Sequence, residues 1–138
     1  MMAALRDAGL LLLALAACGP PDVAPCGGAG VICRVAGTGS ADFNGDGHPP
    51  EQTALNLPSA ARTGPDGLLY LMDFNNMRLR CRVDGDVVDT IAGNGVHAFA
   101  ATDSAALDSP LENPIDFAFR PDGSIALVSL HDPRVLAI

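Results

Sequence analysis

The sequence predicts an all-β fold built from a repeated unit. Comparing the chain with itself at an offset of 56 residues aligns the two halves from residue 36 onward without a gap. Within each copy, short apolar segments are bounded by turn-forming residues, which is typical of β-strands. The aligned pairs are Ala36-Gly37-Thr38-Gly39 with Ala92-Gly93-Asn94-Gly95, Phe43 with Phe99, Leu55 with Leu111, Pro58 with Pro114, Pro65-Asp66-Gly67 with Pro121-Asp122-Gly123, Leu71 with Leu127, and Arg78 with Arg134.

The first copy is expected to hold four strands, at residues 59–63, 68–72, 78–83 and 87–92. Turns are predicted at Pro65-Asp66-Gly67 and at Asp84-Gly85-Asp86. The second copy repeats the scheme at 115–119, 124–128 and 134–138.

The third strand of the first copy alternates strictly between apolar and basic residues. Leu79, Cys81 and Val83 fall on one face, and Arg78, Arg80 and Arg82 on the other. We therefore expect Cys81 to be a buried thiol. The arginines are expected on a solvated face or paired with Asp84 and Asp86, with an acidic ligand as the alternative.

Four strands per repeat, with a longer loop between repeats, is typical of a propeller blade. Repeat 1 is placed at about residues 35–90 and repeat 2 at about 91–138, so the chain is expected to hold about two four-stranded blades, the second incomplete. A partial ring is best explained by truncation, so the chain is expected to be a fragment of a longer propeller protein. The alternatives are self-association that completes the propeller and a partner that completes it.

The motifs together resemble the NHL-repeat β-propellers of bacterial envelope proteins, over residues 31–138. They are Val35–Gly39, Phe43–Gly47, Leu57-Pro58, Gly64–Gly67, Leu69–Leu71 and Asp73–Arg80. The repeat-motif residues are Gly37, Gly39, Asp66, Gly67, Asp73, Asn76, Arg78, Asp122, Gly123 and Arg134. Asp73 and Asn76 are expected to hydrogen-bond the backbone of the turn they bracket, a structural role that the resemblance supports. The second copy departs from the pattern at residues 100–103 and at Ser129, His131 and Asp132.

The N-terminal segment predicts export. An apolar run over residues 8–17 is too short to span a bilayer and fits a signal peptide over residues 1–17. Leu15-Ala16-Ala17-Cys18 resembles the lipobox of bacterial lipoproteins, which implies cleavage between Ala17 and Cys18 and lipid attachment at Cys18. Gly19 follows where the inner-membrane retention signal would carry Asp, so the resemblance implies the outer membrane. The alternative is an ordinary secretory signal with a chance cysteine.

Residues 18–30 contain three prolines and are predicted to be a linker. In an oxidising envelope Cys26 and Cys33 are expected to form a disulfide across a glycine-rich loop, with two free thiols as the alternative. No metal is expected, because a zinc site needs clustered ligands and His48, His97 and His131 are scattered along the chain.

Charge and motif content exclude several functions. The chain carries 16 acidic and 8 basic residues, a formal net charge of −8, which argues against nucleic acid as a partner. Asp42, Asn44 and Asp46 alternate as in a calcium loop, but Thr53 stands where an EF-hand needs glutamate, so a turn held by side-chain hydrogen bonds is favoured. No cofactor is implied. His131 beside Asp132 suggests a base and its orienting group, but we find no catalytic constellation.

The expected function is a non-catalytic binding or scaffold module, lipid-anchored at the bacterial cell envelope. Its partners would be the membrane, through the anchor, and a protein or a carbohydrate. The alternative is a fragment of a six-bladed propeller enzyme of lyase or lactonase type, with a divalent metal in the central channel. The fold alone names no substrate, because function on a propeller lies in its loops.

Overall fold

The computed structural model of the protein describes residues 27–83 and 86–138. The predicted signal peptide, Ala17, Cys18, Cys26, linker residues 18–26 and the turn residues Asp84 and Gly85 lie outside the described residues. No helix in the described part of the chain is long and apolar enough to cross a membrane.

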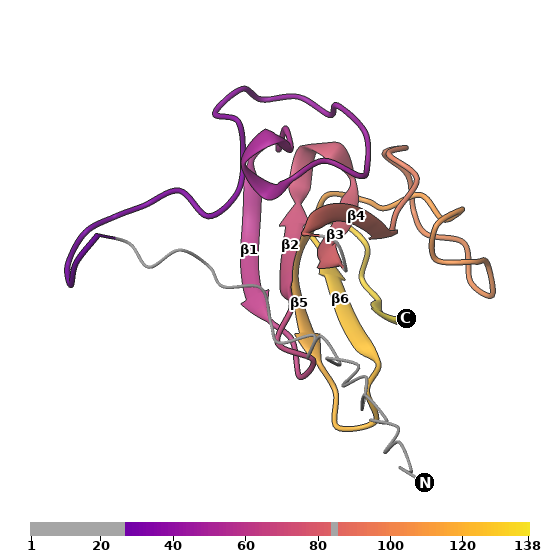
Figure 1. Ribbon diagram of the computed structural model, residues 1–138. Helices are drawn as coiled ribbons and strands as arrows, with labels where there is room; N and C mark the ends of the chain where they lie inside the picture. Colours follow the sequence, from indigo (N-terminus) through magenta and orange to yellow (C-terminus); the bar gives the residue numbers. More distant parts are fainter. Residues whose placement is uncertain (1–26, 84–85) are drawn as a thin grey trace, which may run out of the picture.

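The fold consists of two antiparallel sheets and almost no helix, which confirms the all-β prediction (Figure 1). The first sheet has four strands in sequence order and the second has three. The strands are β1 (Pro58–Thr63), β2 (Leu69–Asp73), β3 (Arg78–Val83) and β4 (Val87–Ala92), then β5 (Pro114–Phe119), β6 (Ile125–Ser129) and β7 (Val135–Ala137). Two short 3-10 helices, η1 (Pro50–Gln52) and η2 (Phe74–Asn76), lie in the loops. The described residues form two sheets and do not show a closed ring.

The repeat found in the sequence is present in the hydrogen bonding. The β1–β2 pair has a register shift between Pro58 and Ala60, and the β5–β6 pair has the same shift between Pro114 and Asp116, 56 residues later. Each bulge sits at the start of its sheet's first strand. The two sheets are therefore built to the same plan.

The β1–β2 and β5–β6 turns are built alike. Asp66 Oδ1 accepts a hydrogen bond from Leu68 N at 3.0 Å, and Asp122 Oδ1 accepts one from Ser124 N at 3.0 Å. The glycines that follow, Gly67 and Gly123, have φ of 81° and 87°, a conformation that favours glycine. These motif residues shape the turns.

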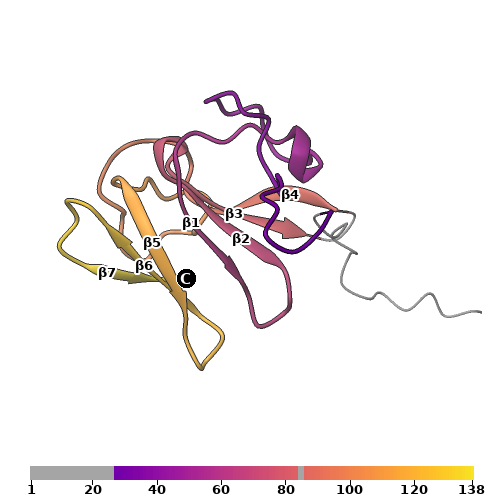
Figure 2. The same cartoon turned by 90° about the vertical axis from the view of Figure 1, so that its left-hand side faces the viewer.

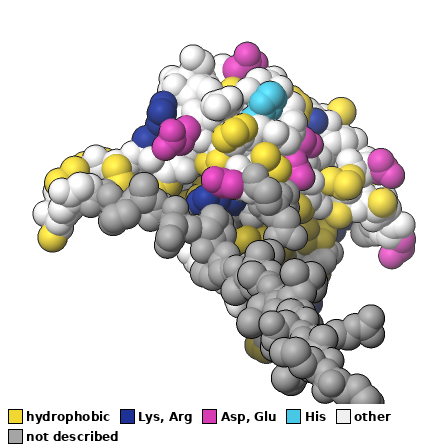
Figure 3. All heavy atoms as spheres, viewed as in Figure 1, with side chains coloured by type: hydrophobic (Ala, Val, Ile, Leu, Met, Phe, Trp, Pro, Cys, Tyr) yellow, Lys and Arg dark blue, Asp and Glu magenta, His cyan; other side chains and the backbone are white. Residues whose placement is uncertain are grey.

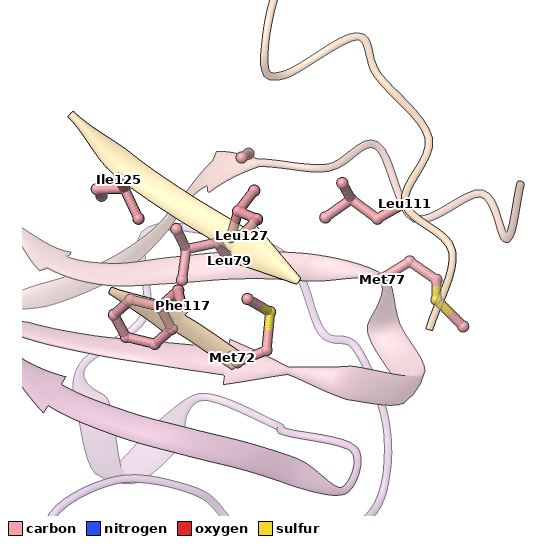
Figure 4. Packing of buried hydrophobic residues seen from close by; sticks show 8 residues of the cluster. Met72, Met77, Leu79, Leu111, Phe117, Ile125 and Leu127 are labelled. Atoms are coloured by element: carbon pink, nitrogen blue, oxygen red, sulfur yellow. The ribbon is translucent and has the colours of Figure 1, made fainter. Parts of the chain in front are cut away.

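The core lies between the two sheets, whose strands Figure 2 shows, and Figure 4 shows how its side chains lie. The strand β5 contacts β1 and β2. The buried residues of the cluster are Met72, Met77, Leu79 and Ala92 from the first sheet and the turn before β3, and Leu111, Phe117, Ile125 and Leu127 from the second sheet and the loop before it. Burial of this shared apolar surface is the main force joining the sheets.

Aromatic rings and one ion pair reinforce the contact between the sheets. The Tyr70 and Phe119 rings meet edge to face with centroids 4.8 Å apart. Arg62 Nη2 lies 2.7 Å and 2.8 Å from the two carboxylate oxygens of Asp116, and Arg62 Nε donates to the Phe117 carbonyl at 2.8 Å. Both charged side chains are partly exposed, so the pair orients the sheets more than it stabilises them.

Cys81 is a free, buried thiol, as predicted. Burial raises its pKa to about 11, so the thiolate is scarce at neutral pH. Cys33 is disulfide-bonded. Since Cys26 lies outside the described residues, its pairing with Cys33 stays a prediction.

Candidate functional site

A group of titratable side chains lies where three loop segments meet around Glu112. Glu112 lies two residues before β5, His97 lies in the loop that leads to it, and His131 lies between β6 and β7. His97 Nε2 is 3.0 Å and His131 Nδ1 is 2.7 Å from Glu112 Oε1. The backbone N–H of His131 donates to Glu112 Oε2 at 2.8 Å, and Asn113 Nδ2 donates to Oε1 at 3.0 Å. The carboxylate thus receives four hydrogen bonds.

Glu112 is held as a carboxylate. Burial raises its pKa, but hydrogen bonds from His97 and His131 outweigh burial and lower the pKa to about 2. A carboxylate only accepts hydrogen bonds, so His97 Nε2 and His131 Nδ1 must carry the hydrogens that face it. When the rings are neutral, His97 Nδ1 and His131 Nε2 therefore carry the lone pairs.

The cluster combines a buried anchor with accessible rings. The Glu112 side chain is 7% exposed, whereas the side chains of His97 and His131 are 55% and 62% exposed. Both imidazoles are thus oriented by a fixed group and remain open to a ligand. Such a surface can donate and accept hydrogen bonds within one small area.

The first repeat has an uncharged version of the same contact. Asn56 and Asn75 stand where the second repeat has Glu112 and His131, and Asn75 Nδ2 donates to Asn56 Oδ1 at 3.2 Å. Ala41 corresponds to His97. Ala41 forms a parallel β-bridge to Leu55, the residue before Asn56, and His97 forms one to Leu111, the residue before Glu112. Both repeats thus have a side-chain contact between these loops. In the first repeat it joins two amides, and in the second it joins a carboxylate and an imidazole.

This cluster was not predicted, because the three histidines are far apart in the sequence. The suggestion that Asp132 orients His131 is wrong. Asp132 binds Arg134, whose Nε and Nη2 lie 2.8 Å and 2.6 Å from its two oxygens. A comparison of the repeats position by position would have singled out Glu112 and His131, where titratable groups replace paired amides.

The calcium-like series Asp42, Asn44 and Asp46 does not form a cation site. In the parts of the chain that the structure describes, no group of three or more His, Cys, Asp or Glu side chains is placed to hold a metal ion. The Asn44 amide bonds the backbone of Gln52 and Ala54, and Asp46 Oδ1 accepts from the Thr90 hydroxyl at 2.8 Å and ion-pairs with Arg80.

The expectation that the β3 arginines lie on a solvated face or pair only with Asp84 and Asp86 is wrong for Arg80. Its side chain is 0% exposed, 3.0 Å from Asp46 and 3.4 Å from Asp73. The loop before β1 covers this face, which the alternating pattern could not show. Burial raises the pKa of Asp73, although hydrogen bonds from Asn56, Asn76 and Arg80 oppose the rise.

The neighbouring arginines differ in their surroundings. Arg78 lies over the Phe43 ring, with its guanidinium carbon 4.1 Å from the centroid, and it donates to Asn94 O at 2.9 Å. Arg82 forms an ion pair with Asp86, as the sequence suggested for this part of the strand. None of these contacts resembles a site for an acidic ligand.

Asp73 and Asn76 are structural, but besides bonding each other they bond backbone groups outside the turn they bracket. Asp73 Oδ1 accepts from Asn56 N at 2.7 Å, and Asn76 Nδ2 donates to Asp42 O at 2.9 Å and to Asp73 Oδ2 at 2.8 Å. They therefore fasten the loop before β1 to the β2–β3 connection. The motif glycines Gly37 and Gly39 have φ of 93° and 91° in the same loop.

A cavity of about 290 Å³ lies between β7 and the loop over residues 100–109. Leu136 and Thr102, which line it, correspond to Arg80 and Asp46 of the first repeat. The charged side chains that fill this space in the first repeat are thus replaced by smaller, uncharged ones. On the face shown in Figure 3, acidic side chains lie scattered among hydrophobic ones.

No protein-family model matches the chain, and no curated protein matches it. The arrangement of the side chains is therefore the basis for a functional proposal.

Proposed function

We propose that the chain is a non-catalytic binding module, lipid-anchored through Cys18 at the outer membrane of a bacterium, which recognises its partner with the loops around Glu112. We further propose that its sheets are blades of an NHL-type propeller. The matched registers and bulges of the β1–β2 and β5–β6 pairs support a common blade plan. The lipobox-like segment ending at Cys18 supports the anchor.

The observation that carries the recognition site is the His97–Glu112–His131 cluster. Its position on loops held by two packed sheets is where binding groups are commonly found. Exposed apolar side chains, Val96 and Leu130, directly adjoin the two histidines in sequence. A partner with mixed polar and apolar surface, such as an envelope saccharide or a protein, would suit this combination.

Binding rather than catalysis is favoured by the lack of an activated nucleophile near the imidazoles in the described residues. The free thiol, Cys81, is buried with a raised pKa. The two rings are tied to the same carboxylate rather than to a hydroxyl or thiol.

Nuclear magnetic resonance of the histidine rings tests the recognition site. We would titrate the full chain with soluble cell-wall saccharide fragments and follow the ring signals of its three histidines. Binding at the proposed site should shift the His97 and His131 signals and leave His48 unchanged, because His48 is bonded to the Asn44 carbonyl in the first repeat. The variant Glu112→Gln should weaken binding. Shifts confined to His48, or no shift for any fragment, would contradict a saccharide site here.

Fractionation of bacterial cells tests the anchor separately. The full chain should partition with the outer membrane and incorporate labelled fatty acid, whereas Cys18→Ala should do neither. Cys81→Ala serves as the matched control, because Cys81 is buried inside the fold. Release of the wild type as well as Cys18→Ala into the soluble fraction would overturn the lipid-anchor proposal. It would not bear on the binding site, which the histidine titration tests separately.

A further inference from the structure

The contact between the two sheets is a template for a second contact of the same kind. One face of the first sheet, carrying Met72 and Leu79, packs against a face of the second sheet that carries Phe117 and Leu127 (Figure 4). Side chains of a strand alternate between the two faces of its sheet, and the two sheets share their register. The positions that the second sheet uses for the internal contact therefore lie on the outer face of the first sheet. Likewise, the positions that the first sheet uses lie on the outer face of the second.

We define two outer faces by these correspondences. The receiving face of the first sheet consists of Val35, Leu55, Ala61 and Leu71, which correspond to Ile91, Leu111, Phe117 and Leu127. The docking face of the second sheet consists of Ala118, Ala126, Val128, Val135 and Ala137, which correspond to Arg62, Tyr70, Met72, Leu79 and Cys81. Val35 on the first and Val135 on the second are 48% and 71% exposed, whereas Leu71 on the receiving face is 4% exposed.

The receiving face is hollowed. A cavity of about 270 Å³ is lined by all four of its residues together with Pro58 and Ala60. At the corresponding place on the second sheet, Leu111, Phe117 and Leu127 are covered by the first sheet, and each is 3% exposed or less. The hollow thus lies where the repeat has a packed sheet.

Neither outer face carries a charge at the positions of the ion pair that joins the sheets inside the chain. Inside the chain, the sheets are joined by the Arg62–Asp116 ion pair. The corresponding residues on the docking and receiving sides are Ala118 and Ala60, so both partners of the ion pair are replaced by alanine together. Contact between the outer faces would therefore leave no unpaired charge at this point.

An arginine and its glycine receptor are also present on the two sides. Within the chain, Arg78 donates to Asn94 O and lies so close to Gly95 that a Cβ there would be 2.0 Å from Arg78 Nη1. The corresponding glycine, Gly39, has no atom within 4 Å of its Cβ position. Arg134, which corresponds to Arg78, is 40% exposed; its Nε and Nη2 bind Asp132 and the Ala100 carbonyl, so Nη1 is the nitrogen that faces an outside acceptor. Gly39 is thus open to an arginine from outside, and the docking side carries one.

The geometry points to self-association: the docking face of one copy of this chain packs on the receiving face of a second copy, and Arg134 of the first donates to the Thr38 carbonyl of the second. The contact is head to tail, so each added copy leaves one face of each kind open, and a ring or a filament results. This inference is independent of the ligand proposed for the His97–Glu112–His131 cluster.

Two variants that each block one face provide the test. Ala61→Arg places a charge in the receiving face, and Val135→Arg places one in the docking face. In sedimentation velocity of the full chain, the wild type should form species larger than a dimer, and each variant alone should be monomeric. An equal mixture of the two should form dimers and nothing larger, because one intact face of each kind remains.

The controls separate this contact from other causes of association. Ala105→Arg, on an exposed loop, should associate like the wild type, and far-UV circular dichroism should show the β signal in every variant. Arg134→Ala should weaken association about tenfold, the loss of one charged hydrogen bond, whereas Arg120→Ala in the β5–β6 turn should not. A monomeric wild type, single variants that associate normally, or a mixture that stays monomeric would each overturn the proposal.

Discussion

Arg80 and Leu136 occupy corresponding positions in the two repeats, yet Arg80 is fully buried against carboxylates and Leu136 lines a cavity. The residue that pairs with Arg80 differs between the repeats as well: Asp73, 3.4 Å from Arg80, corresponds to Ser129. One repeat therefore encloses an ion pair where the other is neutral, on the same backbone plan. The two solutions can be exchanged experimentally.

Replacing Arg80 alone should be strongly destabilising. Arg80→Leu leaves the buried Asp73 carboxylate without its cation, which costs about 3–5 kcal/mol of unfolding free energy. The double variant Arg80→Leu with Asp73→Ser copies the second repeat and should lose less than Arg80→Leu. Urea unfolding followed by circular dichroism measures the four members of the cycle: the wild type, Arg80→Leu, Asp73→Ser and the double variant. Losses that simply add would show that the pair is not coupled.

Gly93 and Gly37 form a matched pair for testing a close approach. A Cβ at Gly93 would lie 2.1 Å from the Met77 carbonyl oxygen, whereas one at Gly37 would meet Leu55 Cδ1 at 3.6 Å. Both residues have positive φ, 89° and 93°, so both alanine variants carry the same backbone strain of about 1–2 kcal/mol. Gly93→Ala should lose clearly more unfolding free energy than Gly37→Ala. Equal urea midpoints for the two variants would rule out the close approach at Gly93.

Glu112 should make stability depend on pH in the acid range. Its pKa is about 2 in the folded protein against an ordinary 4.5, so its contribution is present above pH 4.5 and is lost as the pH falls toward 2. The variant Glu112→Gln should be less stable than the wild type at neutral pH and should lose less stability across this window. Urea midpoints at a series of pH values between 6 and about 2 provide the comparison. Parallel curves for the two proteins would contradict a lowered pKa.

The two contacts that join the sheets should differ in strength. Phe117→Ala removes a ring that is 2% exposed at the centre of the shared core and should cost about 3–5 kcal/mol. Arg62→Ala removes a partly exposed ion pair and should cost about 1 kcal/mol or less. Thermal unfolding of both variants decides between them. A larger loss for Arg62→Ala would mean that the ion pair, rather than apolar burial, holds the sheets together.

The sequence was sufficient for the strands because their signals are local. Turn residues such as Asp66 and Gly67 act within a few positions of themselves, and the strand boundaries agree with the prediction to within one residue. The burial of Arg80 could not be predicted, because the loop that covers it consists of residues distant in sequence, such as Gly45. Alternation identifies two faces but does not reveal what covers each.

The Glu112 cluster was missed for the same reason. His97, Glu112 and His131 are 15 and 19 positions apart, and only the folding of three loops brings them together. The repeat nevertheless contains the information in another form. Asn56 and Asn75 already mark a contact between these loops, and their replacement by Glu112 and His131 is visible in the aligned copies.

The shared register of the β1–β2 and β5–β6 hairpins also bears on how the chain avoids misfolding. Backbone hydrogen bonding alone does not distinguish β2 from β6 as a partner for β1, because both hairpins have the same length and the same bulge. Proximity along the chain favours the native choice, since a hairpin closes sooner than a pairing across a whole repeat. The unlike side chains at corresponding positions, Tyr70 and Ala126 among them, further penalise an exchanged strand. Divergence between the copies is thus a safeguard during folding as well as a source of new chemistry.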